Sequence, residues 1–398
     1  MTTGASSDTT TPLLRPTGSL FISAGEASGD WAGALLVEAL RRQGCELELL
    51  GVGGRRLREA GVHLVADSSS WGAIGVFATI PKLPAACAAR LKVRREWHAS
   101  PPAAVVLIDC GPFNIPLART ARSLGIPVIY YMPPGSWSRR PRSLQLRDLV
   151  DVIAVPFPWT RDLLCGGHAR VEWVGHPAVD SARPTITSEV AYVRYRLDPK
   201  YPIVALAPGS RAHEVRHLLP VLADAGATLV RRHPGIQFLV PLAPTVNREQ
   251  VSSNFCRAGL APTLLNGMEY DALQLAQAAA VCSGTATLEL ACLHIPMVVI
   301  YRASTAVALQ WAIRTRRAGQ RFIALPNIIA DRKVVPELLA KDASPDAVAT
   351  AVSALLSGSE AHARTRADLD QVVSALGGPG ASDRTAALVL QTIANTER

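Results

Sequence analysis

The chain has 398 residues, of which 48% are hydrophobic and 18% charged, and this composition excludes a mostly disordered protein. At about 100–200 residues per domain, the length predicts two domains. The 41 Lys and Arg residues outnumber the 32 Asp and Glu residues, and the net charge of +9 favours anionic partners such as phosphates or acidic lipid. The seven cysteines include no CxxC pair, which indicates reduced thiols rather than a disulfide framework or a zinc site.

Residues 1–17 are rich in Thr and Ser and are predicted to form a disordered tail. Their one apolar pair, Leu13 and Leu14, is shorter than the ~7–15 apolar residues that a signal peptide needs. We expect no membrane span, because polar side chains, a glycine and a proline interrupt the most apolar stretch, residues 272–301.

Residues 18–180 alternate short apolar runs with longer amphipathic stretches, which predicts a doubly wound α/β domain around a mostly parallel sheet. The expected strands are residues 20–24, 47–52, 103–109, 128–132 and 152–155. The expected helices between them include residues 31–43, 113–124 and 144–149.

Residues 181–358 are predicted to form a second doubly wound domain, which follows a proline-rich connection at residues 177–200. Its expected strands are residues 203–207, 238–241, 279–282 and 297–301. Residues 359–398 are predicted to be helices that could pack back on the N-terminal domain. Ligands of open α/β sheets bind at the carboxyl ends of the strands, so two facing domains predict a cleft.

Four strand-to-helix turns combine glycine with hydroxyl or charged residues, at 24–30, 51–54, 208–211 and 283–289. A glycine turn that opens a helix can present free N–H groups to a phosphate, although each turn can equally be structural. Arg211 adds a cation to the third turn, and Glu289 in the fourth is placed to reach a ribose. Neither GxxxxGK[ST] nor GxGxxG occurs, which disfavours a P-loop NTPase and a plain dinucleotide fingerprint.

Acidic residues distinguish the first half. Asp109 ends a predicted strand and is a candidate general base toward a hydroxyl, with a helix cap or a salt bridge as the structural alternative. Glu26 is a second candidate for the same role, whereas His176 at the end of the domain is expected to be structural. No His, Cys and Asp cluster has metal-ligand spacing, so we expect neither a metal nor a cofactor.

Ten short motifs follow one another between residues 21 and 339. They are AGEASGD (24–30), GVGG (51–54), IDxxxFN (108–114), YYxxPxxW (130–137), PF (156–157), VGHP (174–177), PGSRxxEV (208–215), SGTATLE (283–289), PMVVIYR (296–302) and LPNIIA (325–330). In this order they resemble the lipid-A-disaccharide synthase family, inverting glycosyltransferases of the two-domain GT-B architecture.

The resemblance implies transfer of 2,3-diacylglucosamine from UDP-2,3-diacylglucosamine to 2,3-diacylglucosamine 1-phosphate, forming a β-1,6-linked disaccharide and UDP in lipid A biosynthesis. It implies that Asp109 is the catalytic base and that no metal is obligate, while Glu26 stays the second catalytic candidate. The residues implied on the UDP-sugar side are Arg211, Ser283, Gly284, Thr285, Glu289 and Asn327, and Ser210 in the turn at 208–211 is predicted to bind there too.

Three residues in the first half depart from the family pattern: Ala78, Pro112 and Arg139. They keep open a related GT-B lipid glycosyltransferase with a different acceptor. A non-catalytic homologue that binds the UDP-sugar and a sugar-nucleotide epimerase of the same layout are further alternatives.

Two stretches mix apolar with basic residues, at 81–97 and 305–322. They predict contact with an anionic membrane surface, which would place the protein in the cytoplasm, peripheral on the inner face of the bacterial inner membrane. The alternative is an ordinary surface helix whose apolar side lies in the core. We expect no nucleic-acid partner, since no recognition motif accompanies the positive charge. The oligomeric state stays open.

Overall fold

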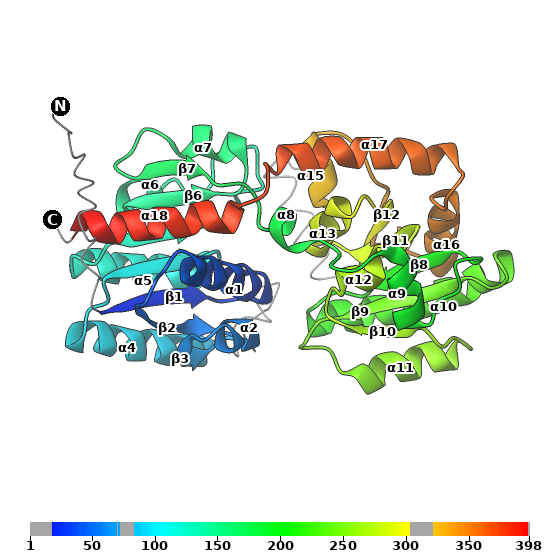
Figure 1. The fold of residues 1–398 in the computed structure, drawn as a ribbon, viewed down its shortest axis with the longest axis horizontal. Coiled ribbons are helices and arrows are strands. Elements are labelled where there is room, and N and C mark those ends of the chain that lie inside the picture. Colours follow the sequence, from blue (N-terminus) through cyan, green and yellow to red (C-terminus); the bar gives the residue numbers. More distant parts are fainter. Residues whose placement is uncertain (1–17, 70, 72–82, 303–320, 397–398) are drawn as a thin grey trace, which may run out of the picture.

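The computed structural model describes residues 18–69, 71, 83–302 and 321–396. These residues form two lobes, each built on one parallel sheet (Figure 1). The strand order is β3-β2-β1-β4-β5-β6-β7 in the first sheet and β10-β9-β8-β11-β12-β13 in the second. The two predicted doubly wound sheets are confirmed.

The first sheet contains seven strands, and helices cover both of its faces. The strands are β1 (Ser19–Ala24), β2 (Glu48–Gly53), β3 (His63–Asp67), β4 (Ala104–Ile108), β5 (Val128–Tyr131), β6 (Val152–Val155) and β7 (Arg170–Trp173). The helices are α1 (Ala27–Arg42), α2 (Arg55–Glu59), α4 (Leu83–Ala99), α5 (Gly111–Ser123), α6 (Leu146–Leu149) and α7 (Pro158–Leu164).

The second lobe follows a connection that contains α8 (Ala178–Ser181) and α9 (Ser188–Tyr195). Its strands are β8 (Ile203–Ala207), β9 (Gln237–Leu242), β10 (Thr263–Asn266), β11 (Ala278–Cys282), β12 (Met297–Tyr301) and β13 (Glu337–Leu339). Its helices are α10 (Ala212–Arg232), α11 (Arg248–Arg257), α12 (Tyr270–Leu273), α13 (Ala286–Cys292), α15 (Leu325–Ala330) and α16 (Pro345–Ala354).

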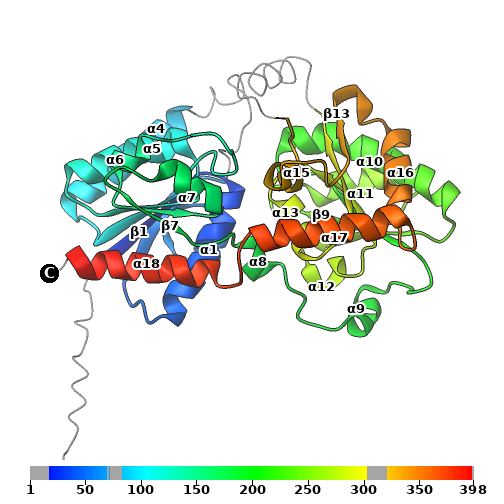
Figure 2. The same cartoon turned by 90° about the horizontal axis from the view of Figure 1, so that it is seen from above.

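The last two helices connect the lobes. Helix α17 (Glu360–Ala375) packs against α13 and α15, and the chain then crosses back so that α18 (Ala381–Thr396) lies along α1 of the first lobe (Figure 2). Asp180 fixes this crossing, because its carboxylate accepts hydrogen bonds from the N–H groups of Gly380 (2.6 Å) and Ser382 (2.9 Å). The start of α18 is thereby tied to the interlobe connection.

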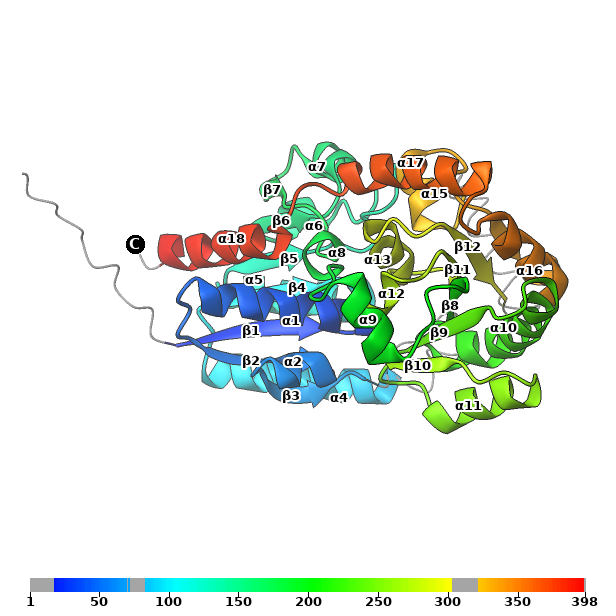
Figure 3. The ribbon, with the colours of Figure 1, turned by 45° about the vertical axis from the view of Figure 1, so that its right-hand side comes forward.

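The central strands of both sheets are completely apolar and buried, which is typical of a parallel sheet covered on both faces. In each sheet the chain reverses its direction of travel between two neighbouring central strands: β1 and β4 in the first, β8 and β11 in the second. Figure 3 shows β1 running toward the second lobe. Ligands of such sheets bind outside the carboxyl ends of the strands at this switch point, so each lobe presents one such point.

Candidate active site

The switch point of the first sheet brings together Glu26, which precedes α1, and Asp109, which follows β4. Asn114 holds this edge. Its Oδ1 accepts a hydrogen bond from Ser23 Oγ at 2.6 Å, and its Nδ2 donates to the carbonyl oxygens of Ile108 (2.9 Å) and Asp109 (3.0 Å). The backbone of Asp109 is therefore fixed by its own lobe, and these bonds leave its carboxylate free for other partners.

The backbone at Asp109 is strained. Asp109 and Cys110 are consecutive left-handed residues, with φ of 46° and 41°. Such conformations cost on the order of 1–3 kcal/mol for residues other than glycine and concentrate at functional sites. Gly25 passes so close that a Cβ there would lie 2.2 Å from Cys110 Sγ, so only glycine fits where the ends of β1 and β4 meet.

The carboxyl group of Asp109 is also electrostatically unusual. Burial raises its pKa to about 6, and the negative charge of Glu26 contributes to the increase, whereas the N–H of Cys110 and the guanidinium of Arg211 oppose it. A carboxylate with this pKa is ionised at neutral pH but binds a proton more tightly than an ordinary aspartate. That is the property expected of a general base.

The switch point of the second sheet carries Arg211, between β8 and α10. Its Nη2 donates to Glu26 Oε2 of the first lobe at 2.8 Å, and its Nη1 donates to Glu214 Oε1 at 2.9 Å. Glu214 Oε2 also accepts from the N–H groups of Ser210 and Arg211, each at 3.2 Å. The expectation of free N–H groups in the turn at 208–211 is thus wrong for these two, because Glu214 occupies them.

The turn after β11 is more open. Gly284 has a φ of +159°, and a Cβ there would meet nothing within 4 Å, while the flanking Ser283 and Thr285 are half-buried. Ser283 Oγ donates to the carbonyl oxygen of Ile323 at 2.9 Å, which ties the turn to the segment before α15. The turn therefore leaves space beside the end of β11.

Glu289 lies deeper in the same lobe. Its Oε2 accepts a hydrogen bond from the Tyr270 hydroxyl at 2.7 Å. Burial raises the pKa of Glu289, while the Tyr270 hydroxyl and the positive charge of Arg56 on the first lobe lower it. The sequence had not singled out Tyr270 and Arg56 as site residues, since neither lies in a glycine turn. They make Glu289 part of a cluster that spans both lobes.

Asn327 is completely buried and uses its whole hydrogen-bonding capacity within the second lobe. Its Oδ1 accepts from the N–H groups of Val334 (2.7 Å) and Val335 (2.8 Å). Its Nδ2 donates to the carbonyl oxygen of Val335 (2.9 Å) and to Glu337 Oε1 (2.8 Å). The side chain ties α15 to β13, and a direct contact with a ligand would require one of these bonds to break.

One predicted phosphate-binding turn has a different role. In the turn at 51–54, the N–H groups of Gly54 (2.6 Å), Arg56 (3.0 Å) and Leu57 (3.2 Å) donate to the carboxylate of Asp30. The start of α2 is thus capped by α1, and the turn is structural. His176 is structural too, as expected: it is buried, its Nδ1 accepts from the N–H of Ala178, and burial lowers its pKa to about 3.

Arg139, which departs from the family pattern, contacts the second lobe. Its Nη2 donates to the carbonyl oxygen of Ile329 at 2.6 Å, and its guanidinium lies 4.4 Å from the centroid of the Trp159 ring. Ile329 lies in the last turn of α15, where the helix dipole favours a cation. The substitution therefore supplies an interlobe contact.

Of the two basic amphipathic stretches predicted to contact a membrane, the structure describes most of the first and only the end of the second. In α4, Val93 and Trp97 lie in the core, and the Trp97 ring packs edge-on against Phe21 at 5.1 Å between centroids. A role in facing lipid is therefore wrong for these two, although Leu91 is 54% exposed. The other stretch, 305–322, lies outside the described residues except for its last two.

Across the ranges given above, no helix is long and apolar enough to cross a membrane. In the same part of the chain, no group of three or more His, Cys, Asp or Glu side chains is arranged to hold a metal ion.

Comparisons with known proteins agree over nearly the whole chain. Residues 20–392 match the family described as Lipid-A-disaccharide synthetase. The lipid-A-disaccharide synthase of Geobacter sulfurreducens is 37% identical over 375 residues, which cover 94% of this chain and 97% of the relative. That of Syntrophus aciditrophicus is 36% identical over 380 residues, which cover 95% and 98%.

Solved structures show the same fold at low sequence identity. The UDP-GlcNAc 2-epimerase from Neisseria meningitidis bound to UDP-GlcNAc has a TM-score of 0.63 at 11% identity, covering 94% of this chain and all of that one. The calicheamicin glycosyltransferase CalG4 has a TM-score of 0.59 at 14% identity, covering 96% and 100%. The fold is thus GT-B, and the chain belongs to the lipid-A-disaccharide synthetase family, glycosyltransferases of lipid A biosynthesis.

Proposed function

We propose that the chain transfers 2,3-diacylglucosamine from UDP-2,3-diacylglucosamine to 2,3-diacylglucosamine 1-phosphate, with a β-1,6-linked disaccharide and UDP as products. The observation that carries the proposal is the meeting of the two switch points. Asp109, with a pKa of about 6, lies at the first, and Glu26 links that edge to Arg211 at the second through a 2.8 Å ion pair. A proton acceptor and a cation that can bind a diphosphate thereby lie at one junction between the lobes.

The first lobe supplies the base. The Asp109 carboxylate takes the proton of the acceptor hydroxyl while the hydroxyl oxygen attacks the anomeric carbon of the donor sugar. The bond from that carbon to the diphosphate breaks on the opposite face, which inverts the configuration. The proton ends on Asp109, and the electron pair of the broken bond leaves with UDP.

The second lobe stabilises the leaving group. Arg211 donates hydrogen bonds to the diphosphate oxygens as their negative charge grows. Its Nη2 must then break the hydrogen bond to Glu26 and donate to the diphosphate instead. Ser210 lies beside it in the same turn. The open turn of Ser283, Gly284 and Thr285 receives the rest of the nucleotide.

Glu289 and Asn327 complete the proposed UDP-sugar side in different ways. Glu289 would bind the ribose with Tyr270 orienting its carboxylate, since the two groups are already hydrogen-bonded at 2.7 Å. Asn327 would act indirectly, because its four hydrogen bonds hold the segment between α15 and β13. The proposal needs no metal ion.

A second candidate function differs only in the acceptor. Ala78, Pro112 and Arg139 depart from the family pattern in the first half of the chain, although Ala78 lies outside the described residues. The guanidinium of Arg139 is engaged by the carbonyl oxygen of Ile329 in α15. A related lipid glycosyltransferase with another acceptor would keep the donor half unchanged.

Mass spectrometry of the products distinguishes these functions. Purified protein is incubated with UDP-2,3-diacylglucosamine and with acceptors that differ in their phosphate and acyl groups. We expect the mass of the disaccharide 1-phosphate, together with stoichiometric UDP. A product only with another acceptor would support the second candidate. UDP-sugar isomerisation without acceptor, or binding without turnover, would contradict both.

The proposed location is the cytoplasm, in peripheral contact with the anionic inner face of the bacterial inner membrane, since both substrates carry acyl chains. The support is the net charge of +9 of the full sequence and the exposed face of α4, where Leu91 stands beside Arg94 and Arg95. A cationic surface with one apolar side chain favours anionic lipid.

A further inference from the structure

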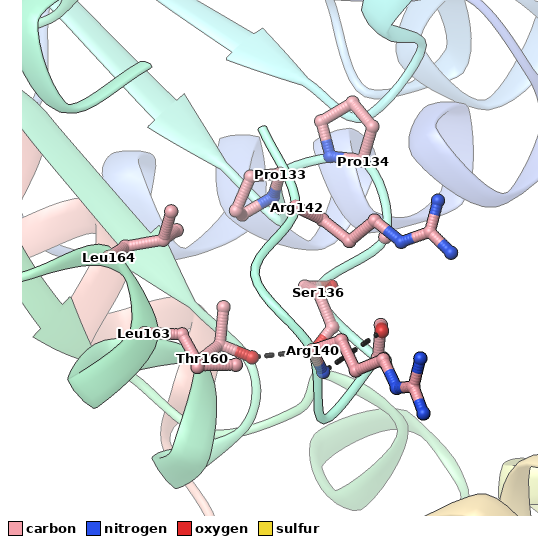
Figure 4. Close-up of a pocket in the computed structure, with 10 residues that line it drawn as sticks. Pro133, Pro134, Ser136, Arg140, Arg142, Thr160, Leu163 and Leu164 are labelled. Carbon is pink, nitrogen blue, oxygen red and sulfur yellow. Dashed lines mark hydrogen bonds between the residues drawn. The ribbon is translucent and has the colours of Figure 1, made fainter. Parts of the chain in front are cut away.

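A shallow pocket opens on the first lobe between the loop that follows β5 and helix α7 (Figure 4). Strand β5 is the neighbour of β4, so the loop starts at the same sheet edge as Asp109. The loop also packs on the start of α5: a Cβ on Gly111, two residues after Asp109, would lie 2.9 Å from Pro134 Cγ. The loop that lines the pocket therefore begins near the proposed base, on the first lobe.

Two arginines, Arg140 and Arg142, line this pocket. Figure 4 shows their guanidinium groups on the same side of the loop, extending away from Leu163 and Leu164 of α7. Within the described ranges, neither guanidinium forms an ion pair or a hydrogen bond, whereas those of Arg139 and Arg211 are both engaged. Two cations that no carboxylate neutralises make this pocket a place for an anion.

The loop that carries the two arginines is firmly built. Gly135 has a φ of +76°, and the stem of Arg142 packs over it, so that a Cβ there would lie 3.1 Å from Arg142 Cγ. Ser138 Oγ accepts from the N–H of Arg140 at 3.1 Å, which leaves the Ser138 hydroxyl proton available to a ligand. Thr160 Oγ1 donates to the carbonyl oxygen of Ser136 and ties the loop to α7.

We infer that this pocket binds the phosphate monoester of the acceptor, with Arg140 and Arg142 donating hydrogen bonds to its oxygens. The inference rests on the proposed function. A sugar whose hydroxyl lies at Asp109 carries its 1-phosphate across the ring, and the loop that carries the two arginines follows β5, the strand next to β4. Guanidinium groups suit a phosphate dianion because each offers a fork of N–H donors.

The test compares two acceptors in neutral detergent, 2,3-diacylglucosamine 1-phosphate and the same sugar without its phosphate. Arg140→Ala and Arg142→Ala should each raise KM for the phosphorylated acceptor about tenfold, and the double variant about a hundredfold. KM for the other acceptor and the affinity for UDP should not change. Arg161→Ala, which removes an exposed arginine of α7 outside the pocket, is the matched control.

Equal effects on both acceptors, or none on either, would overturn the inference while the disaccharide product still supports the proposed function. An effect seen only with anionic vesicles would overturn it too, because the arginines would then serve membrane phosphate.

A second readout does not need turnover. Calorimetry with glucosamine 1-phosphate should show binding to the wild type and to Arg161→Ala but not to the double variant, and no binding of glucosamine. Equal binding by the wild type and the double variant would contradict the inference even if the wild type formed no disaccharide.

Discussion

Two features of Asp109 destabilise the folded chain. Its backbone is left-handed, and burial beside Glu26 raises its pKa from 3.8 to about 6. Because the folded chain holds the Asp109 proton more tightly than the unfolded chain, this group lowers stability as the pH rises from about 4 to 6, and the loss is complete above 6. The shift corresponds to a penalty on the order of 2–3 kcal/mol at neutral pH.

Asp109→Asn separates catalysis from stability. We expect turnover to fall ~10²–10⁴-fold, because the amide cannot accept the proton, while UDP affinity stays nearly the same. The same change should raise the melting temperature at pH 7.5 by several degrees, since it removes a buried charge and asparagine tolerates a positive φ. Steady-state kinetics, calorimetry and thermal unfolding measure the three quantities.

The pH dependence provides a further check on Asp109. Wild-type kcat should fall below a pH of about 6, where the Asp109 carboxylate becomes protonated, and the residual activity of Asp109→Asn should lack this decline. A variant that melts lower and loses UDP together with turnover would mean that Asp109 is structural. Turnover within a few fold of wild type would assign the base elsewhere, with Glu26 the first to test.

At the scale of the elements, the sequence predicted the central strands and failed at the edges. Strands β4, β8 and β11 are continuous apolar runs, and β1 is apolar apart from Ser19 and Ser23, because both faces of these strands are covered. Such runs stand out in a sequence. The edge strands β3, β7, β10 and β13 expose one side and lack that signal. The sequence therefore predicted where the switch points lie but missed the edge strands of both sheets.

The candidate site could also be predicted only in part: the positions of its residues, but not their contacts between the lobes. The motifs placed Glu26, Asp109 and Arg211 after central strands, where the structure has them. The Glu26–Arg211 pair was not predictable, since it joins residues 185 positions apart and depends on how the lobes face each other. The contact of Glu214 with this turn could have been predicted from the sequence. Glu214 lies three residues after Arg211, which is the spacing at which a carboxylate accepts a hydrogen bond from the N–H at the start of its helix.

The close approach of the segments that follow β1 and β4 gives an element-scale prediction. Gly25→Ala should lower turnover at least about tenfold and reduce the melting temperature, because its Cβ would lie 2.2 Å from Cys110 Sγ and must push the Asp109 segment aside. Cys110→Gly removes the clashing side chain and suits a φ of 41°, so the double variant should regain most of the activity.

Cys110→Gly alone is the control and should remain active. Kinetics and thermal unfolding of the three variants form a double-mutant cycle. A strictly additive result, with no recovery in the double variant, would show that Gly25 matters for another reason than this contact.

At the scale of the whole molecule, the excess of positive charge predicts salt-dependent binding to lipid. The protein should float with vesicles that contain anionic phospholipid, float less with neutral vesicles, and be released as salt rises. Arg94→Ser with Arg95→Ser should weaken the binding about tenfold or more, at near 1 kcal/mol per basic residue. The matched control replaces two exposed arginines of the other lobe, Arg231→Ser with Arg232→Ser. Equal binding to neutral and anionic vesicles would contradict this prediction.

The contacts that join the two lobes are of two kinds. Arg139 reaches the end of α15, and Asp180 anchors the crossing to α18, and neither contact involves the groups proposed for the chemistry. The Glu26–Arg211 pair does, and its side chains are 30% and 27% exposed, so water and ligands can reach it. Glu26 therefore occupies the cation to which the proposed diphosphate would bind. We expect the nucleotide to compete with Glu26 for Arg211.

Two variants with opposite effects test this competition. Arg211→Ala should weaken UDP at least about tenfold, since a charge-assisted contact contributes ~1.5–3 kcal/mol. Glu26→Gln should instead tighten UDP several-fold, because the competing charge is gone, while Glu59→Gln, at an exposed glutamate of α2, should leave the affinity unchanged.

The same two variants should move the acid limb of kcat in opposite directions. Loss of the Glu26 charge lowers the pKa of Asp109, and loss of the Arg211 charge raises it, so the limb shifts to lower pH in Glu26→Gln and to higher pH in Arg211→Ala. Calorimetry with UDP and kcat profiles from pH 4.5 to 8 measure both effects. Weaker UDP binding in Glu26→Gln would contradict the competition. A hundredfold loss of turnover in Glu26→Gln with tighter UDP binding would keep the competition and transfer the role of the base from Asp109 to Glu26.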